Sequence, residues 1–247
     1  MRLERENLIM DFSLITERFK DHEGFYLETH LHTSAASKCA SITPEDTVRM
    51  YKRAGYDGII VTDHFMSGNT AVDKTLPWDE QVDMFFKGYE RAKAEGEKIG
   101  LKVFEGLEYT DYGTDFLVYG LSHEFIKANP QMMEMEPPEF LKLFREGGAT
   151  LIQAHPFREA SYVREVRAFP EYVDAVEVVN LGNRDREWDR KAFELAKANS
   201  LPMTAGSDCH HFGDDQFGAG IILKKEPEDL TEICKLIREG KVEYFGG

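Results

Sequence analysis

The sequence predicts a parallel α/β fold that closes into a (β/α) barrel. Predicted strands alternate with predicted helices along the chain, which is typical of a parallel sheet. Polar side chains able to bind metal ions follow at least five of these strands, and the carboxyl ends of barrel strands form the functional rim of that fold. An open doubly wound sheet would also place its site there. A single crevice would not gather groups from five strands, so the closed ring is favoured.

The strands are predicted from apolar, β-prone runs, several of them continuous, as expected for parallel strands buried on both faces. They cover residues 25–31, 58–62, 101–107, 116–121, 149–154, 175–179, 202–205 and 221–223. The helices are placed by cap and stop signals, such as Thr43-Pro44 before the first and Gly55 after it. They cover residues 43–54, 79–99, 139–147, 160–168, 186–199 and 226–240. Residues 111–115 read as a turn between two strands.

The domain organisation is predicted to be one barrel over residues 25–247, preceded by a helical extension over residues 1–24. The extension is predicted because Leu8, Phe12, Ile15 and Phe19 recur with helical spacing and form one apolar face. A chain of 247 residues with 42% apolar residues is long enough for one such barrel.

Composition excludes several classes of protein. The net charge is −15, from 45 acidic and 30 basic residues, so no extended nucleic-acid footprint is expected, because gripping phosphates requires a surplus of Lys and Arg. No apolar run approaches the roughly 20 residues of a membrane helix, so no membrane association is expected. Three cysteines without CxxC spacing, behind a charged N-terminus, predict a cytoplasmic protein without a disulfide framework. Oligomeric state is left open.

The metal-site prediction starts from His30 and His32. Residues two apart on a strand point to the same side, so both imidazoles project together. Four later strands end in the same way, on His64, Glu108, His155 and the Asp208–His210 segment. One histidine at a strand end is more often a buried structural residue, but this repeated pattern favours a site, because carboxylates and neutral imidazoles ligate Zn, Mn and Fe.

Other residues were weighed against these ligands. Glu105 is the rival of Glu108, but it lies within a predicted strand and is expected to be paired or to point outward. Arg158, three residues after His155, is expected to hold an anionic substrate or its transition state. The sequence contains no GxSxG, phosphate-binding glycine loop or dinucleotide fingerprint. A carboxylate can bridge two cations about 3.5–4 Å apart, as in two-metal hydrolases.

These motifs resemble those of the PHP (polymerase and histidinol phosphatase) superfamily of metal-dependent phosphoesterases. The matching segments, in the order of the family, are His30-Leu31-His32, Thr62-Asp63-His64, Gly106-Leu107-Glu108, His155-Pro156-Phe157-Arg158 and Gly206-Ser207-Asp208-Cys209-His210. The resemblance implies a distorted (β/α)7 barrel holding two or three divalent ions, commonly Zn, Mn or Fe, at the carboxyl ends of the strands.

The resemblance also implies which residues bind which ion. The first ion would lie on His30, His32, Glu108 and Asp208. Glu108 would bridge to a second ion that His155 also holds, with Asp115 at a position where many members have histidine. His64 and His210 would hold a third. Many members have an Asp or His five residues after the second histidine of the first motif; here that residue is Ser37, a poor ligand.

The function expected from this resemblance is hydrolysis of a small phosphate ester. A water activated by the metals would attack phosphorus, with Arg158 stabilising the charge. His64 or His210, if not bound to metal, would protonate the leaving oxygen. One alternative is an amidohydrolase-type enzyme that cleaves C–N or C–O bonds, although no lysine stands at a predicted strand end as a bridging ligand. The other is a metal-binding barrel that has lost activity, which Ser37 favours.

Overall fold

The computed structural model describes residues 23–211 and 217–246, and it confirms the α/β barrel fold. The strands are β1 Phe25–Leu31, β2 Gly58–Val61, β3 Lys102–Asp111, β4 Thr114–Tyr119, β5 Thr150–Ala154, β6 Ala175–Asn180, β7 Met203–Gly206, β8 Gly220–Leu223 and β9 Glu243–Phe245. The helices are α2 Pro44–Arg53, α3 Trp78–Phe85, α4 Lys87–Ile99, α5 His123–Ala128, α6 Glu139–Glu146, α7 Arg186–Ala198 and α8 Leu230–Arg238, with a 3₁₀ turn at Pro130–Glu134. The helical extension predicted for residues 1–24 lies almost wholly outside the described residues.

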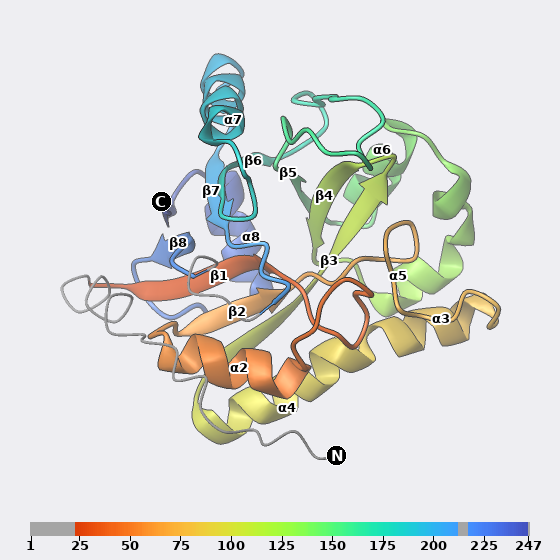
Figure 1. The fold of residues 1–247 in the computed structure, drawn as a ribbon, viewed down its shortest axis with the longest axis horizontal. Helices are drawn as coiled ribbons and strands as arrows, with labels where there is room; N and C mark the ends of the chain where they lie inside the picture. The colour runs from red at the N-terminus through yellow and green to blue at the C-terminus, as the bar shows by residue number, and fades with distance from the viewer. Residues whose placement is uncertain (1–22, 212–216, 247) are drawn as a thin grey trace.

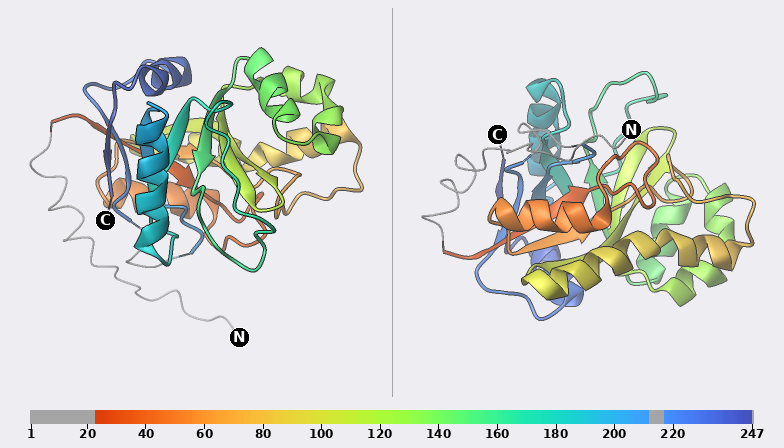
Figure 2. Two further views of the ribbon diagram at one scale, coloured as in Figure 1. Left: turned by 90° about the horizontal axis from the view of Figure 1, so that it is seen from above. Right: turned by 60° about the horizontal axis from the view of Figure 1, so that its bottom comes forward.

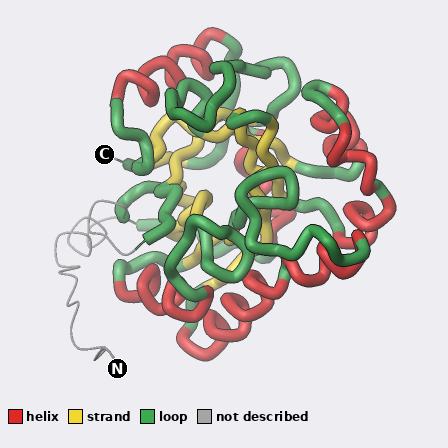
Figure 3. The backbone as a smooth tube through the Cα atoms, turned by 45° about the vertical axis from the view of Figure 1, so that its right-hand side comes forward, coloured by secondary structure: helices red, strands yellow, loops and turns green. Residues whose placement is uncertain are grey.

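The strands form one nine-stranded sheet in the order β7-β6-β5-β4-β3-β2-β1-β8-β9. Figure 3 shows the strands at the centre of the molecule with the helices outside them. The sheet nearly closes where the chain after β7 returns to the end of β1, since His32 N donates to Cys209 O at 3.0 Å and Asp208 N donates to His30 O at 2.7 Å. The barrel is therefore confirmed, whereas the count of seven strands is not.

Gly206, the last residue of β7, is required at this closure. A Cβ atom at this position would collide with the Cβ of His30 and would lie 2.7 Å from Glu177 Oε1. Real Cβ atoms do not approach other atoms so closely, so a larger residue would push β7 away from β1. The glycine in the Gly206-Ser207-Asp208 motif thus allows the strand that leads to Asp208 to approach the strand that carries the two histidines.

The fourth strand differs from an all-parallel barrel, because β4 runs antiparallel to both β3 and β5. Only Tyr112 and Gly113 connect β3 to β4, and both have positive φ values, 50° and 84°. Such a two-residue link makes a hairpin, whereas a parallel crossover needs a dozen or more residues. The reversal places Asp115, near the start of β4, opposite Ala154 at the end of β5. Asp115 therefore reaches the same rim as the ends of the parallel strands.

Two predicted helices differ from the structure. The helix expected over residues 79–99 is interrupted at Phe86, between α3 and α4. Both Phe85 and Phe86 are buried, and the interruption lets these successive residues enter the core together. Residues 160–168 form no helix. This segment instead packs on the β3–β4 hairpin, where Arg164 N donates to Tyr112 O and the Arg167 guanidinium pairs with Asp111.

The ends of the chain differ in smaller ways. The last helix begins at Leu230 rather than near residue 226, because the Asp229 carboxylate caps it by accepting from Glu232 N at 2.9 Å. The short strand β9 was not predicted. Strand β3 continues through Glu108 to Asp111, so Glu108 lies within a strand rather than beyond its end. None of the helices in the described ranges combines the length and apolarity needed to span a bilayer.

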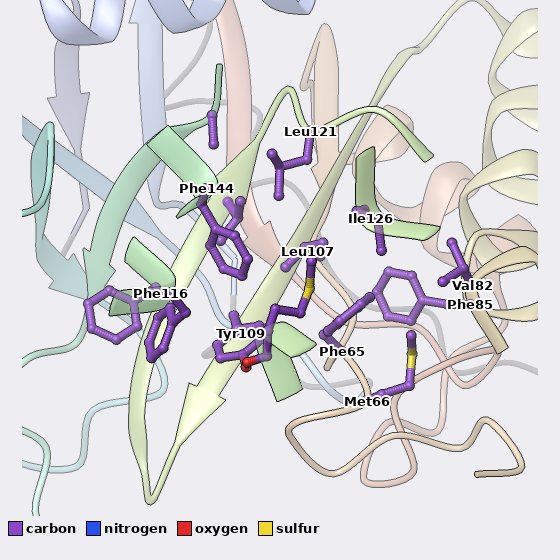
Figure 4. Close-up of a cluster of buried hydrophobic side chains, with 14 of the residues drawn as sticks. Phe65, Met66, Val82, Phe85, Leu107, Tyr109, Phe116, Leu121, Ile126 and Phe144 are labelled. Atoms are coloured by element: carbon purple, nitrogen blue, oxygen red, sulfur yellow. The ribbon is translucent and has the colours of Figure 1, made fainter. Parts of the chain in front are cut away.

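The core is divided between the two sides of the sheet. Helices α2 and α4 lie side by side below β1 and β2 in Figure 1 and again in the right-hand view of Figure 2. On the other side, aromatic residues of β3, β4 and α6 pack with Phe65 and with the C-terminal half of α3, as Figure 4 shows around Phe65, Tyr109, Phe116 and Phe144. In a further hydrophobic cluster, α8 packs against apolar side chains of the strands. These packed layers hold the strand ends that carry the candidate site.

Candidate metal centre

The two histidines of the first motif lie at the end of β1 and are fully buried. His30 Nδ1 lies 2.9 Å from Glu177 Oε1 and must donate, because an ionised carboxylate only accepts. His32 Nδ1 lies 3.0 Å from the hydroxyl of Ser37, which itself donates to Asp63 at 2.6 Å, so His32 Nδ1 is the donor in that contact. In the neutral form of each ring the lone pair is therefore on Nε2, and the two Nε2 atoms lie 3.3 Å apart.

Glu108 is the carboxylate at which the histidines converge. Its Oε1 lies 3.2 Å from His30 Nε2 and 3.4 Å from His155 Nε2. Its Oε2 lies 3.6 Å from His32 Nε2 and 2.5 Å from His64 Nδ1. The chain after β2 continues beside β3, with Phe65 N donating to Glu108 O at 2.9 Å, and this pairing brings His64 to Glu108. One buried carboxylate thus contacts four imidazoles from three different strand ends.

Asp208 faces the same centre from the segment after β7, where the barrel closes against β1. Its Oδ1 lies 3.2 Å from His32 Nε2, and its Oδ2 lies 2.7 Å from Arg158 Nη1. Asp208 and His155 both have positive φ values, 54° and 27°. Non-glycine residues are held in that region only when surrounding structure forces them, and such residues concentrate at functional sites.

His64 and His210 form a second pair of imidazoles on the outer side of the centre. His210 Nδ1 donates to its neighbour's carbonyl, Asp208 O, at 2.8 Å. Its Nε2 therefore carries a lone pair, and this atom lies 3.4 Å from His64 Nε2. Burial raises the pKa of the nearby Cys39 thiol, but His210 and His64 outweigh burial and lower this pKa to about 6.

These donors fit divalent metal ions. Four groups have possible ligand atoms that all lie within 4.8 Å of one another: His30, His32 and Glu108; Glu108, Asp115 and His155; His32, His64 and His210; and His30, His155 and Glu177. In both imidazole pairs two Nε2 lone pairs face each other, which is repulsive unless a proton or a cation lies between them. The buried Asp115 Oδ1 also lacks a hydrogen-bond partner, and Glu108 Oε2 and His64 Nδ1 approach each other without the geometry of a hydrogen bond.

The charges in the cluster shift the pKa values of its members. Burial opposes charge on His30, but Glu177 and Asp208 outweigh it and raise the pKa of His30 well above its usual value. Burial would raise the pKa of Glu108, but the charge of His64 and hydrogen bonds from His155 and His30 lower it well below the usual range. A cluster that keeps its carboxylates ionised when buried is one that attracts cations.

All eight residues predicted as metal ligands lie in this cluster, and Arg158 lies beside it. Arg158 is nearly buried, and its Nε and Nη2 donate to Asn183 and Asn180 at 2.9 and 2.7 Å. Together with the contact to Asp208, these bonds use three of its five N–H donors. Glu105, the rival of Glu108, pairs instead with His123 at 2.9 Å, as expected of a paired residue.

Sequence reasoning missed the residues that orient these side chains. Glu177, on β6, holds His30 through Oε1, while its Oε2 accepts from His155 N at 3.0 Å and from Asn180 Nδ2 at 2.8 Å. Asp63 orients the first loop through Thr33 as well as Ser37. The signal for Glu177 was a single acid within the apolar strand Ala175–Asn180, where a buried charge requires partners.

A cavity of about 980 Å³ opens onto the cluster. Its inner wall includes His64, Glu108, Asp115, His155, Arg158, Asp208 and His210. Its outer wall is formed by residues 66–69, by Tyr112 and Gly113 of the β3–β4 hairpin and by residues 133–136. Lys74 and Tyr162 also line it, and both are exposed. Six of the eight candidate ligands, all except His30 and His32, therefore line a space that a small molecule can enter.

Comparison with known proteins finds a short match in sequence and a shared fold. A family model described as PHP-associated matches residues 186–242. No curated protein matches the sequence. A solved structure from Bacteroides vulgatus, a two-domain protein containing a predicted PHP-like metal-dependent phosphoesterase, is similar with a TM-score of 0.65 and 17% identity. The similarity covers 89% of this chain but only 64% of that protein, so this chain spans less than two thirds of it.

Two further structures share the fold over most of both chains. One is a proposed metal-dependent phosphoesterase from Bifidobacterium adolescentis, with a TM-score of 0.55, 16% identity, and coverage of 86% of this chain and 96% of that one. The other is an amidohydrolase from Chromobacterium violaceum with bound sulfate and no metal, with a TM-score of 0.54, 15% identity, and coverage of 88% and 97%. Residues 186–242 are thus similar in sequence to a PHP-associated segment, and the chain shares its barrel fold with PHP-like proteins.

Proposed function

We propose that this protein is a metal-dependent phosphoesterase that hydrolyses a small phosphate ester. The observation that carries the proposal is the convergence of five imidazoles and three carboxylates, with Glu108 shared between two groups, in a cluster that the cavity reaches. Two proteins of similar fold are described as metal-dependent phosphoesterases. The sulfate bound to a third is, like phosphate, a tetrahedral anion.

The proposed ligand assignment follows the distances between the possible ligand atoms. His30, His32, Glu108 and Asp208 would hold a first ion, where the two Nε2 atoms face each other. Glu108, Asp115 and His155 would hold a second. His64 and His210 would hold a third at their own facing nitrogens. Two or three Zn, Mn or Fe ions are compatible with such a set of nitrogen and oxygen donors.

The chemistry that bound divalent ions supply is Lewis acidity, which lowers the pKa of water and stabilises negative charge on a phosphoryl group. The protein's own residues would do the rest. Arg158 pairs with Asp208 and lines the cavity, where its remaining N–H donors would bind phosphate oxygens. His64 and His210 serve as ligands when the third position is filled, and otherwise donate the proton that the leaving oxygen needs.

The test is hydrolysis by the full chain, stripped with chelator and reloaded with Mn²⁺ or Zn²⁺. Phosphate mono- and diesters would be compared with amides and lactones, in isotopically labelled water. We expect turnover of phosphate esters with the label in the released phosphate, because water attacks phosphorus. Turnover of amides or lactones alone would instead establish the amidohydrolase alternative.

The amidohydrolase alternative has one observation in its favour, the fold similarity to the protein from Chromobacterium violaceum. Its bridging ligand would be a lysine, often carboxylated. Among the described residues that line the cavity, Lys74 is the single lysine, and it is exposed at the outer wall. The position between the groups is taken by Glu108, so the phosphoesterase proposal is preferred.

Metal affinity is expected to rise with pH. Neighbouring carboxylates outweigh burial and raise the pKa values of His30 and His64, so the metal-free protein keeps both imidazoles protonated near neutral pH. A metal ion binds only the neutral imidazole, so binding must release those protons. The free-energy cost of removing them falls as the pH rises toward the pKa values of the two imidazoles in the folded protein. Calorimetric titrations in two buffers with different ionisation enthalpies would count the protons. An affinity independent of pH would contradict this.

Substituting Glu177→Gln is expected to weaken metal binding by about 10–100-fold, the usual cost of losing an orienting partner. All three of its partners donate to it, so the amide nitrogen of Gln would face a donor in place of an acceptor. Glu105→Gln is the matched control, because that carboxylate pairs with His123 away from the cluster. Equal metal affinities in the two variants, measured by competition with a chelating dye, would show that Glu177 does not position His30.

A further inference from the structure

The segment at the end of β6, residues 180–183, holds the guanidinium of Arg158. Asn180 Oδ1 accepts from Arg158 Nη2 at 2.7 Å, and Asn183 Oδ1 accepts from Arg158 Nε at 2.9 Å. Since Asp208 lies 2.7 Å from Nη1, each of the three guanidinium nitrogens has a partner. One N–H therefore remains on Nη1 and one on Nη2, and the arginine lines the cavity.

Gly182 brings the backbone of this segment against the same ion pair. A Cβ atom at this position would lie 3.1 Å from Arg158 Nη2, 3.1 Å from Asp208 Oδ2 and 3.0 Å from Asn180 Oδ1. Gly182 N also donates to Asn180 Oδ1 at 2.8 Å. The guanidinium therefore has little room to move toward this segment, and the acceptor that it uses there is itself held by the backbone.

Each of the two asparagine amides has a second partner that fixes its orientation. Asn180 Nδ2 donates to Glu177 Oε2 at 2.8 Å, and Asn183 Nδ2 donates to Asp189 Oδ1 at 2.7 Å. A carboxylate only accepts and a guanidinium only donates, so neither amide can turn round without facing groups of its own kind. Both Oδ1 atoms are thereby held toward Arg158.

Asp189, in the first turn of α7, anchors the segment from outside. Its Oδ1 also accepts from Asn180 N at 3.2 Å, and its Oδ2 pairs with Arg186 at 2.9 Å. Asn180, Asn183 and Asp189 do not line the cavity, so they can affect a ligand there only through the residues that they hold. Asn180 also contacts Glu177, which positions His30, so Asn183 tests Arg158 more separately from the metal centre.

We propose that Asn180 and Asn183 are positioning residues, which hold the Arg158 guanidinium so that its two remaining N–H donors meet the phosphoryl group of the substrate. This inference rests on the proposed function and specifies how the protein binds the anion. An arginine that is already held loses less conformational freedom when it binds a ligand, and this strengthens binding. Charge-assisted bonds to phosphate oxygens also depend on the orientation of the planar guanidinium.

The test is calorimetric binding of inorganic phosphate to the full chain, loaded with Mn²⁺ and freed of unbound metal. We expect Asn183→Ala to weaken phosphate binding by about tenfold or more, the cost of separating a charged donor from its acceptor. Asp189→Ala, which leaves both amide acceptors of Arg158 in place, should weaken it less. The control Asn129→Ala removes a hydrogen bond at the end of α5, away from the cavity, and should bind phosphate as the wild type does.

A double-variant cycle separates positioning from a general effect on the fold. In the Arg158→Met background, Asn183→Ala should not weaken phosphate binding further, because the guanidinium that Asn183 holds is absent. Equal losses in both backgrounds would overturn the inference, since Asn183 would then act without Arg158. If Asn183→Ala does not fold, Asp189→Ala takes its place in the same cycle.

The outcomes separate this inference from the proposed function. Ester hydrolysis together with unchanged phosphate binding in Asn183→Ala would overturn the positioning role and leave the phosphoesterase proposal intact. Phosphate binding that depends jointly on Asn183 and Arg158, in a protein that hydrolyses no phosphate ester, would support the positioning role and contradict the function. A metal-loaded wild type that does not bind phosphate would overturn the inference.

Discussion

Substituting Glu108→Gln is expected to reduce phosphoester hydrolysis by about 10³-fold or more and to release metal from the centre. Glu108 contacts His30, His32, His64 and His155 and belongs to two of the four ligand groups. Gln has the same shape but no charge, so two ions could no longer share an anion. A loss of about 4 kcal/mol of charge stabilisation corresponds to that change in rate. Steady-state kinetics and metal content per chain would be measured together.

The control for this substitution is Glu105→Gln, three residues earlier on the same strand. Glu105 pairs with His123 and does not line the cavity, so its rate and metal content should stay within about twofold of wild type. If Glu108→Gln kept both near the wild-type level, the cluster would not be the catalytic centre.

Substituting Asp208→Asn is expected to abolish hydrolysis and also to destabilise the metal-free protein by about 3–5 kcal/mol. Asp208 pairs with the nearly buried Arg158 at 2.7 Å. Removing the carboxylate leaves the guanidinium buried without its counter-charge. Urea denaturation of chelator-treated proteins would measure the free energy of unfolding.

The double variant Arg158→Met with Asp208→Asn separates stability from function. Replacing the guanidinium by an apolar side chain of similar length removes the unpaired charge, so most of the lost stability should return. Hydrolysis should not return, because the proposed ligand is still missing. A double variant that regained activity along with stability would show that Asp208 acts only through folding.

Much of the centre could be predicted from sequence because its ligands follow local rules. The His30-x-His32 spacing places both rings on one side of a strand. His64, His155 and Asp208 each come shortly after a buried run, so the direction of parallel strands alone brings them to one rim. Those relations depend on near neighbours in the chain.

The parts that sequence reasoning missed depend on contacts between distant segments. Glu177 is recognised as an orienting residue only once the folded barrel brings its carboxylate, on β6, to His30 on β1. The antiparallel β4 follows from positive φ values at Tyr112 and Gly113, which the sequence marked only as a turn. The helix predicted over residues 160–168 does not form, because this segment bonds instead to the β3–β4 hairpin, where Arg167 pairs with Asp111.

The central claim is that this cluster hydrolyses phosphate esters with bound metal. The most direct measurement is a titration of the chelator-stripped full chain with Mn²⁺ or Zn²⁺ while hydrolysis of p-nitrophenyl phosphate and its bis ester is followed. The account predicts no turnover without metal and turnover of at least one ester that saturates at two or three equivalents of metal per chain. A protein that binds neither ion, or that binds them and hydrolyses neither ester, would contradict it.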